Sequence, residues 1–291
     1  VWNGAAPTEP VGAIFTKTEV TEFIMDLAGY DPQAKRLAAS RLLEPSCGDG
    51  AFVRVAIRRL LESERRRTPT IDWDNAELAA AIRACDVNIG FVIEARSKIV
   101  DQLVEAGCPL ASAAILAEQW VDHSDFLLTP WRDKFDYVIG NPPYVRIEDL
   151  PSKVLQRYRE TYQTCAERAD LYVAFFEQGL QLLSQGGSLA FICANRFTKN
   201  LYGQALRELI TRRFRVRYYL NLEHTQPFVS EVSAYPCVVV IDRRHGEMTR
   251  AASLDNLEAG LLSGLLRGKD SAEANEWAHF PTWYKDGAPW V

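Results

Sequence analysis

The most distinctive chemistry lies in Asn141 and the Pro142-Pro143-Tyr144 that follow it, at the end of the run DYVIGNPPY. The side-chain oxygen of Asn141 and the backbone carbonyl of Pro142 can accept both hydrogens of one amino group. The prolines restrict the backbone and hold these acceptors in place. Such a pair suits the amine of adenine, whose lone pair is delocalised into the ring. The two acceptors draw the nitrogen toward a tetrahedral shape and direct its lone pair at an electrophilic methyl group.

Tyr144 adds a flat aromatic face on which a base removed from a helix can stack. A proline-stiffened strand end with a capping asparagine is the structural alternative for the same residues. The combination of an oriented acceptor, two prolines and an aromatic ring favours the catalytic interpretation. The proposed chemistry requires neither a metal ion nor a covalent intermediate.

A second candidate site is the run EPSCGDGAF at residues 44–52, which follows a short predicted strand. Gly48 and Gly50 allow a sharp turn and let a ligand approach where a Cβ atom would clash. The G-x-G spacing is shorter than the dinucleotide fingerprint, and the loop has no lysine to hold a triphosphate. An ordinary turn between a strand and a helix can have the same glycines, so the loop alone does not define a ligand.

Two acidic residues extend this loop into a candidate adenosine site. Asp86 ends the next strand region, where an acid can accept both hydroxyls of a ribose. Asp125 and Phe126 follow the third strand region, where a carboxylate can accept from an adenine amine while a ring packs on the base. Aspartates exposed at strand ends are the alternative. In this chain order, and without a phosphate grip, the residues indicate S-adenosylmethionine rather than a dinucleotide.

A strand-then-helix rhythm predicts the fold that brings these groups together. The predicted helices span residues 16–29, 51–64 and 170–183, and the predicted strands span residues 41–44, 77–85, 113–117, 135–140, 188–194, 216–222 and 236–242. Thr16 is the expected N-cap of the first helix, with Glu19 completing a capping box. The alanines in 77–85 and 113–117 leave helix open for both. The pattern predicts an α/β fold with a mostly parallel, doubly wound sheet and an antiparallel edge hairpin from the last two strands.

Composition narrows the class of protein. Of 291 residues, 47% are hydrophobic and 24% charged, and no apolar run reaches the length of a membrane span. We therefore expect a cytoplasmic protein without membrane association. The six cysteines show no C-x-x-C spacing, so neither zinc nor disulfides are expected. The net charge of −5 leaves nucleic acid undecided, because the arginines at 65–67 and between 207 and 217 also suit a solvated surface.

The order of the motifs resembles that of the γ-class adenine-N6 DNA methyltransferases, including those fused to endonucleases in type IIG restriction–modification systems. The likeness covers residues 12–242, with a leading segment GAIFT at 12–16, the glycine loop and the NPPY loop at 141–144. It implies the class I S-adenosylmethionine-dependent methyltransferase fold. It also implies site-specific adenine-N6 methylation of double-stranded DNA in a restriction–modification or phage-defence system.

The resemblance also assigns roles to individual residues. Thr16 and Glu44 are expected at the methionine part of the cofactor, Asp86 at the ribose, and Asp125 and Phe126 at the adenine. Four further residues complete the expected cofactor site: Ser46, Cys47, Gly48 and Pro143. Phe228, ahead of Val232-Ser233-Ala234, matches an aromatic that packs with Tyr144 against the flipped base, a role that Tyr235 could share.

Two positions depart from the family pattern. Lys17 stands where a proline usually follows the threonine, which could alter the cofactor lid. Asn88 stands where a second acid is common after Asp86. Protein-glutamine methyltransferases of the release-factor type also use an NPPY loop on an amide nitrogen, and they remain an alternative, as do RNA methyltransferases and a catalytically silent recognition subunit. The capped helix shortly before the first strand favours the DNA enzyme, because the release-factor enzymes begin with a helical bundle.

The catalytic domain is expected to span residues 1–245. Residues 246–291 are expected to begin a linker or target-recognition region whose remainder lies outside this chain. The expected partners are double-stranded DNA and a fused or separate endonuclease.

Overall fold

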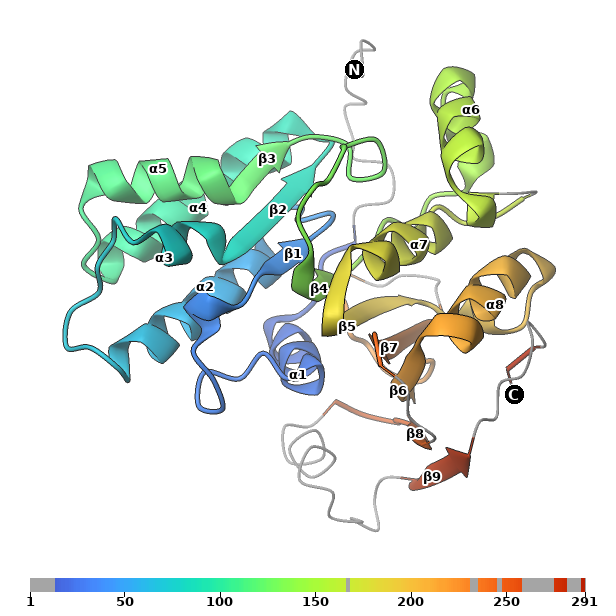
Figure 1. Ribbon diagram of the computed structural model, residues 1–291. Coiled ribbons are helices and arrows are strands. Elements are labelled where there is room, and N and C mark those ends of the chain that lie inside the picture. Colours follow the sequence, from blue (N-terminus) through green and yellow to red (C-terminus); the bar gives the residue numbers. More distant parts are fainter. Residues whose placement is uncertain are drawn as a thin grey trace.

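A computed structural model of the protein describes residues 14–165, 168–230, 235–244, 248–257, 275–281 and 289–290. The chain forms one large sheet with helices packed against it (Figure 1). The strands are β1 (Leu42–Glu44), β2 (Ile82–Asp86), β3 (Val121–His123), β4 (Phe135–Gly140), β5 (Leu183–Ala194), β6 (Arg215–Asn221), β7 (Pro236–Asp242), β8 (Met248–Ser253) and β9 (Asn275–Pro281). The helices are α1 (Thr18–Ala28), α2 (Ala51–Arg65), α3 (Ala76–Ala80), α4 (Ile89–Glu105), α5 (Leu110–Trp120), α6 (Ser152–Thr161), α7 (Tyr172–Leu182) and α8 (Gln204–Arg213).

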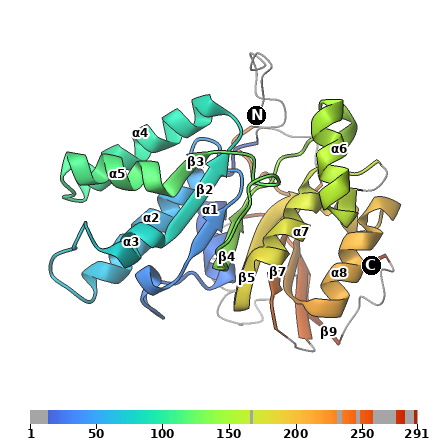
Figure 2. The ribbon, with the colours of Figure 1, turned by 45° about the horizontal axis from the view of Figure 1, so that its top comes forward.

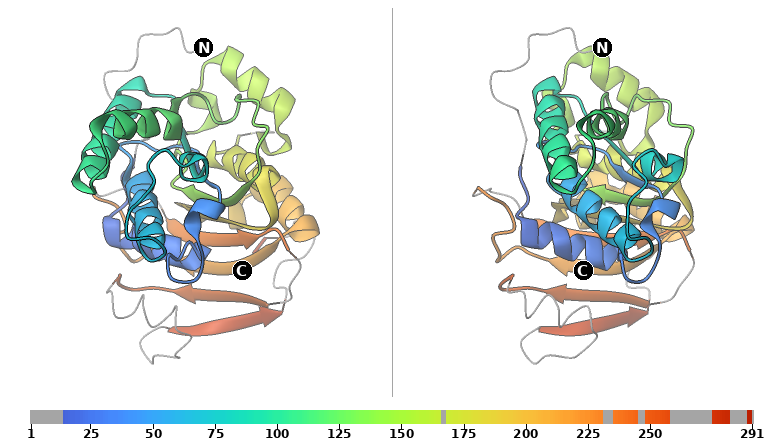
Figure 3. Two further views of the ribbon diagram at one scale, coloured as in Figure 1. Left: turned by 60° about the vertical axis from the view of Figure 1, so that its left-hand side comes forward. Right: turned by 90° about the vertical axis from the view of Figure 1, so that its left-hand side faces the viewer.

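The strands lie in the order β3-β2-β1-β4-β5-β7-β6-β8-β9. Strands β3, β2, β1, β4 and β5 pair in parallel. Strand β7 lies antiparallel between β5 and β6. The predicted fold class and the antiparallel pair are therefore confirmed. Strands β8 and β9 continue the same sheet beyond this pair (Figure 3), while the domain boundary at residue 245 stays a prediction.

The side chains of the strands divide into two hydrophobic cores, one on each face of the sheet. Leu42 and Ile139 belong to the first core, whereas their neighbours Leu43 and Val138 belong to the second. This division follows from the strand geometry, in which successive side chains point to opposite faces. Helices α1 to α5 contribute to the first core and α6 to α8 to the second. Figure 2 shows α2–α5 and α6–α8 as separate groups beside the sheet.

Two of the predicted strands are wrong in whole or in part. Residues 77–80 lie in α3, and β2 begins only at Ile82. Residues 113–117 lie inside α5, and the third strand, β3, starts directly after that helix. Both stretches are rich in alanine, the residue with the highest helix propensity. The helix propensity of the alanines therefore accounts for helix, and not strand, in both stretches.

The predicted capping box at the first helix is also wrong. Helix α1 begins at Thr18, its N-cap is Lys17, and no side chain caps it. Thr16 instead forms an isolated β-bridge with Phe228. At this point a tertiary contact replaces the local cap that the spacing of Thr16 and Glu19 suggested.

Three general features concern the cysteines, the length of the helices and metal binding. All six cysteines are free and buried, and the sulfur atoms of Cys193 and Cys237 lie 3.8 Å apart on the paired strands β5 and β7. In the part of the chain that the structure describes, no helix is long and apolar enough to cross a bilayer. The same part holds no cluster of three His, Cys, Asp or Glu side chains that could bind a metal ion.

The order of strands changes direction between β1 and β4. From β1 the chain builds β2 and β3 on one side, whereas β4 and β5 lie on the other. The connections that follow β1 and β4 therefore run in opposite directions along the sheet. Open α/β sheets bind ligands at the carboxyl ends of two such strands. The glycine loop follows β1 and the NPPY loop follows β4. The sheet thus brings together Ser46 and Asn141, which are 95 positions apart in the sequence.

Candidate active site

The glycine loop turns sharply between β1 and α2. Gly48 and Gly50 have positive φ angles of 51° and 88°, which residues with a Cβ atom rarely adopt. The N–H group of Cys47 donates to the carbonyl of Cys85 at 3.0 Å. The hydroxyl of Ser46 donates to the backbone carbonyl of Asn141 at 3.0 Å. The glycine loop is therefore joined on one side to β2 and on the other to the NPPY loop at residues 141–144.

Asp86 lies beside the glycine loop, as expected, and its carboxylate already has two backbone partners. Its Oδ2 accepts from the N–H of Gly48 at 3.0 Å, and its Oδ1 accepts from the N–H of Asn88 at 2.8 Å. Burial raises the pKa of Asp86, and these two donors oppose the shift. Each carboxylate oxygen has a second lone pair. Asp86 can therefore hold the loop and still accept from a ligand hydroxyl.

Glu44, the last residue of β1, is a buried acid that forms no ion pair with the described residues. It is 1% exposed, and its Oε2 has no hydrogen-bond partner in the described structure. Burial raises the pKa of the Glu44 carboxyl well above its ordinary value, opposed by the N–H of Val53 and reinforced by Asp49 and Asp86. An unpaired buried carboxylate is unfavourable. The position therefore suits the ammonium group of an amino-acid ligand.

Asn141 is oriented by its amide nitrogen. The Nδ2 atom donates to the backbone carbonyl of Ile14 at 2.7 Å and to Thr16 Oγ1 at 3.3 Å. A backbone carbonyl can only accept, so the nitrogen end of the amide must face Ile14. The other end, Oδ1, is buried and has no partner among the described residues. The NPPY loop thus presents an oriented acceptor to which a donor from outside the protein can bind.

The leading segment reaches Asn141 because it pairs with residues 227–229. The N–H of Lys17 donates to the carbonyl of Pro227 at 3.0 Å, and the N–H of Val229 donates to the carbonyl of Phe15 at 2.9 Å. A Cβ atom on Gly48 would lie 3.4 Å from the ring of Phe15. The leading segment therefore contacts both the glycine loop and the NPPY loop. Gly12 and Ala13 of the predicted segment lie outside the described residues.

Tyr144 and Phe228, the predicted target-base residues, lie together. Their ring centroids are 6.0 Å apart in an edge-to-face arrangement. Phe228 is 2% exposed, while Tyr144 is half-buried with a hydroxyl that has no partner in the described structure. Burial raises the pKa of Tyr144, and the nearby Cys193 and Cys237 add to the shift. Tyr144 and Phe228 therefore form an aromatic pair after β4, and the contact of either ring with a target base stays a prediction.

Two other predictions about the target base concern the segment after Phe228. Tyr235 is 50% exposed, and its carbonyl accepts from the N–H of Asn195 at 2.8 Å. Residues 232–234 lie outside the described residues. The structure thus leaves a role of Tyr235 beside Phe228 as a prediction.

Asp125 follows β3 as expected, and both its oxygens have protein partners. The N–H of Leu127 donates to Oδ1 at 2.9 Å, and the hydroxyl of Tyr158 donates to Oδ2 at 2.8 Å. Burial raises the pKa of Asp125, and the Tyr158 contact opposes the shift. Phe126 is 1% exposed and packs against Phe175 with ring centroids 5.0 Å apart. Its ring lies in the second core, and its contact with adenine stays a prediction.

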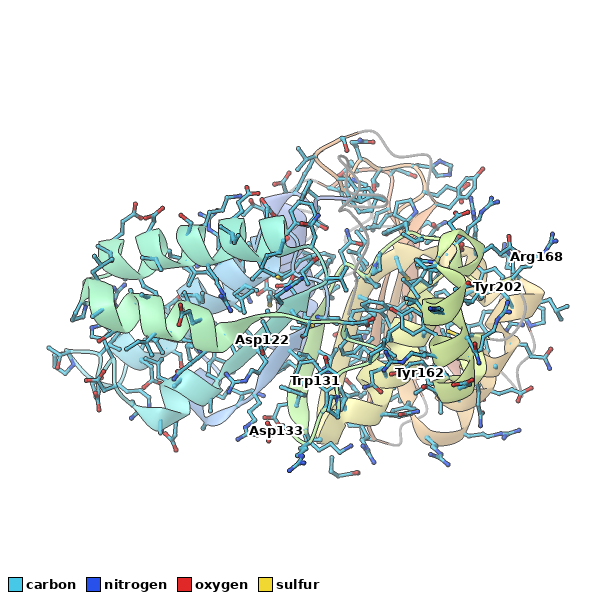
Figure 4. All side chains as sticks on the ribbon, turned by 90° about the horizontal axis from the view of Figure 1, so that it is seen from above. Asp122, Trp131, Asp133, Tyr162, Arg168 and Tyr202 are labelled. Atoms are coloured by element: carbon cyan, nitrogen blue, oxygen red, sulfur yellow. The ribbon has the colours of Figure 1, made fainter. Side chains whose placement is uncertain are left out.

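Sequence patterns missed one member of the site and the role of another. Ile14 belongs to the predicted leading segment, but no residue pattern reveals that its backbone carbonyl orients Asn141. Tyr158 lies on α6, which in the sequence comes between the NPPY loop and α7, and no sequence spacing connects Tyr158 with Asp125. At the end of α6, Tyr162 donates to the carbonyl of Leu127 at 2.5 Å. Tyr162 and Trp131, both labelled in Figure 4, line a surface pocket of about 370 Å³ between α6 and the loop after β3.

The arginine clusters do not form a single surface at the site. Arg65 ends α2, a 15-residue helix, and Arg66 and Arg67 follow it, so the cluster begins about 22 Å from the start of the helix at the glycine loop. Arg207 and Arg217 donate to backbone carbonyls inside the protein. The first cluster is solvated, and part of the second stabilises the fold.

The fold and the site define the chain as a class I S-adenosylmethionine-dependent methyltransferase in architecture. A solved structure from Listeria monocytogenes, described as a member of that class, superposes with a TM-score of 0.61. The alignment covers 88% of this chain and 71% of that chain at 15% identity.

The chain belongs to the Eco57I restriction-modification methylase family, whose profile matches residues 53–228. Type II methyltransferase M.PaeR7I of Pseudomonas aeruginosa is 41% identical over 97% of this chain and 50% of its own length. Type II methyltransferase M.XhoI of Xanthomonas vasicola is 39% identical over 91% and 49%. Adenine-specific methyltransferase PglX of Streptomyces coelicolor is 26% identical over 65% and 20%. The chain spans about half the length of the first two relatives, and the predicted restriction–modification methylase class is confirmed.

Proposed function

We propose that the protein transfers a methyl group from S-adenosylmethionine to N6 of an adenine flipped out of duplex DNA. It would act as the modification enzyme of a restriction–modification or phage-defence system. The Oδ1 of Asn141 carries this proposal, because it is oriented by the contacts of Nδ2 and has no partner among the described residues. The names of the relatives, which are type II and adenine-specific methyltransferases, agree with it.

The residues around the glycine loop fit the cofactor that the fold and the family imply. Glu44 Oε2 would accept from the ammonium group of the methionine part, and Thr16 would donate to the same part. Asp86 would accept from the ribose hydroxyls through its remaining lone pairs, and Asp125 would accept from the adenine amine. The other expected members of the cofactor site are Ser46, Cys47, Gly48, Phe126 and Pro143. Bound S-adenosylmethionine supplies an electrophilic methyl group on a sulfonium centre.

On the target side, Asn141 Oδ1 and the backbone carbonyl of Pro142 accept the two hydrogens of the adenine amine. This arrangement directs the nitrogen lone pair at the methyl carbon. When the methyl carbon–sulfur bond of the cofactor breaks and the new carbon–nitrogen bond forms, a neutral thioether would leave and the positive charge would pass to the nitrogen, where the same two acceptors would stabilise it. The amine then loses one proton to solvent. Tyr144 and Phe228 pack against the base and hold it outside the helix.

Methyl-transfer assays on three substrates test the proposal. The full-length protein with tritiated S-adenosylmethionine should label duplex DNA, and digestion should yield N6-methyladenine. Labelling of structured RNA or of a peptide-chain release factor, without labelling of DNA, would replace the proposal with one of the two alternatives. The absence of transfer to all three, with intact cofactor binding, would favour a silent recognition subunit.

The proposed partners follow from the same activity. Double-stranded DNA is the substrate, and an endonuclease, fused or separate, would complete the restriction system. Residues 246–291 would lead from the catalytic domain toward a target-recognition region. The net charge of −5 and the scattered arginines give the chain no general attraction for DNA. Sequence recognition would therefore depend on specific contacts to base edges.

Glu44→Gln is expected to stabilise the ligand-free protein at neutral pH and to weaken cofactor binding. Because the folded-state pKa of Glu44 lies above its unfolded value, this carboxyl lowers the free energy of unfolding as pH rises through the folded-state pKa. Glutamine does not titrate, so the advantage of the variant should grow as pH rises above 4.5, the ordinary pKa of a glutamate carboxyl. Each 1 kcal/mol of it should raise the Tm by about 2–4 °C.

Calorimetry should show that S-adenosylmethionine binds Glu44→Gln roughly tenfold or more weakly, as for loss of a charge-assisted hydrogen bond. Glu118→Gln is a matched control, because Glu118 lies exposed on α5. Equal melting curves of wild type and Glu44→Gln at every pH would contradict the buried-carboxylate interpretation.

A further inference from the structure

The amide of Asn141 can be placed in two orientations that differ only in the exchange of its nitrogen and oxygen atoms. Catalysis as proposed requires the oxygen to remain available for the adenine amine. The structure achieves this through two acceptors on the leading segment, the carbonyl of Ile14 at 2.7 Å and Thr16 Oγ1 at 3.3 Å from Nδ2. The opposite orientation would place an acceptor against the carbonyl of Ile14, which has no proton to donate.

The position of Thr16 is itself determined by tertiary contacts. Thr16 is 6% exposed and forms a β-bridge with Phe228. The flanking hydrogen bonds, from Lys17 to Pro227 and from Val229 to Phe15, hold the segment on both sides of Thr16. Thr16 therefore approaches Asn141 from a segment that is hydrogen-bonded to residues 227–229.

The hydroxyl of Thr16 has one proton and two lone pairs. One lone pair accepts from Asn141, and the proton has no acceptor in the described structure. The hydroxyl can therefore donate to a ligand while it accepts from the catalytic amide. A threonine that served only the cofactor would not need to lie within hydrogen-bond distance of Asn141.

We propose that Thr16 is a positioning residue for Asn141, which keeps the amide oxygen directed at the target amine. This inference rests on the proposed function and extends it, because it assigns to the leading segment a part in methyl transfer in addition to cofactor binding. Loss of the Thr16 hydroxyl leaves the carbonyl of Ile14 as the one orienting acceptor among the described residues. The fraction of Asn141 in the productive orientation then falls, and so does the rate at saturating cofactor.

The test compares Thr16→Val, Thr16→Ser and Thr21→Val in the full-length protein. Thr21 is a matched control, because it is fully buried on α1 and its hydroxyl donates to the carbonyl of Lys17 at 3.2 Å. Single-turnover methyl transfer is measured at saturating S-adenosylmethionine and saturating DNA. Thr16→Val should be slower by about tenfold, as for loss of one net hydrogen bond. Thr16→Ser should recover most of the rate, and Thr21→Val should keep it.

Two outcomes of the kinetic test would overturn the inference. An unchanged saturated rate in Thr16→Val, with any loss confined to the dissociation constant of the cofactor, would make Thr16 a cofactor contact alone. Equal losses in Thr16→Ser and Thr16→Val, or a similar loss in Thr21→Val, would show a merely structural role. Thermal melting of each variant separates slower transfer from partial unfolding.

A spectroscopic readout keeps this inference distinguishable from the proposed function. In protein labelled with ¹⁵N-asparagine, the side-chain amide signal of Asn141 is identified by its loss in Asn141→Ala. That signal should shift in Thr16→Val and remain in place in Thr21→Val, without any substrate present. An unshifted signal would overturn the inference even if DNA is methylated. A shifted signal in a protein that fails to methylate DNA would overturn the proposed function alone.

Discussion

Asn141→Ala is expected to lower the rate of methyl transfer by about 100-fold or more while cofactor binding stays nearly intact. The reason is geometric, because Oδ1 is a buried acceptor in the NPPY loop that has no partner among the described residues. Only the target amine uses it, so its loss raises the barrier to transfer without removing a cofactor contact. Calorimetric titration of S-adenosylmethionine and tritium transfer to DNA measure the two effects separately.

Asn75→Ala is a suitable control for this experiment. Asn75 is the N-cap of α3, where its side chain accepts from the N–H groups of Glu77 and Leu78. Its loss should cost about 1 kcal/mol of stability, as for other helix caps, and leave the transfer rate unchanged. Turnover at the wild-type rate in Asn141→Ala would end the catalytic assignment.

Tyr144→Phe is expected to keep most of the activity, whereas Tyr144→Ala should lose much of it. The ring of Tyr144 lies against Phe228, and its hydroxyl is buried without a partner in the described structure. Stacking of a base on an aromatic ring is worth roughly 1–3 kcal/mol in alanine substitutions, which corresponds to about 5- to 150-fold. Removal of the unpaired hydroxyl should not lower the Tm, because no hydrogen bond is lost.

Tyr202→Phe provides the contrast for the tyrosine test. The hydroxyl of Tyr202 donates to Asp170 Oδ2 at 2.8 Å and lies 3.0 Å from the hydroxyl of Tyr172. Its removal should therefore lower the Tm, unlike that of the Tyr144 hydroxyl. Equal losses of activity in Tyr144→Phe and Tyr144→Ala would contradict the stacking role.

Fluorescence of 2-aminopurine at the target position adds an independent readout. The base brightens when it leaves the helix and is quenched when it stacks on an aromatic ring. The flipped base should therefore be brighter with Tyr144→Ala than with the wild type. Equal brightness in the two complexes would place the base away from Tyr144.

Much of the candidate site was predictable because its groups follow strands. Glu44, Asp86, Asp125 and Asn141 come at or just after the ends of β1, β2, β3 and β4. The carboxyl ends of parallel strands meet at one edge, so these groups had to be neighbours once a parallel sheet was expected. The motif order also identified the family, which the comparisons confirm.

The errors in the fold arose where local patterns were ambiguous. Alanine-rich residues 77–80 and 113–117 alternate too little to distinguish strand from helix, and both are helical. The threonine and glutamate spacing at Thr16 matched a capping box. The free energy of pairing with residues 227–229 was absent from that local comparison, and it moved Thr16 out of the helix.

The sequence by itself determined which chemical groups the protein has and which strand ends bear them. It specified two acceptors in the NPPY loop, a glycine turn and the acids of a candidate adenosine site. Only the tertiary structure decided how those groups are oriented. The direction of the Asn141 amide depends on a carbonyl of Ile14, 127 positions away, and the carboxylate of Asp125 depends on Tyr158, 33 positions away. Hydrogen bonds between distant segments form only after the sheet has assembled, so no local pattern contains them.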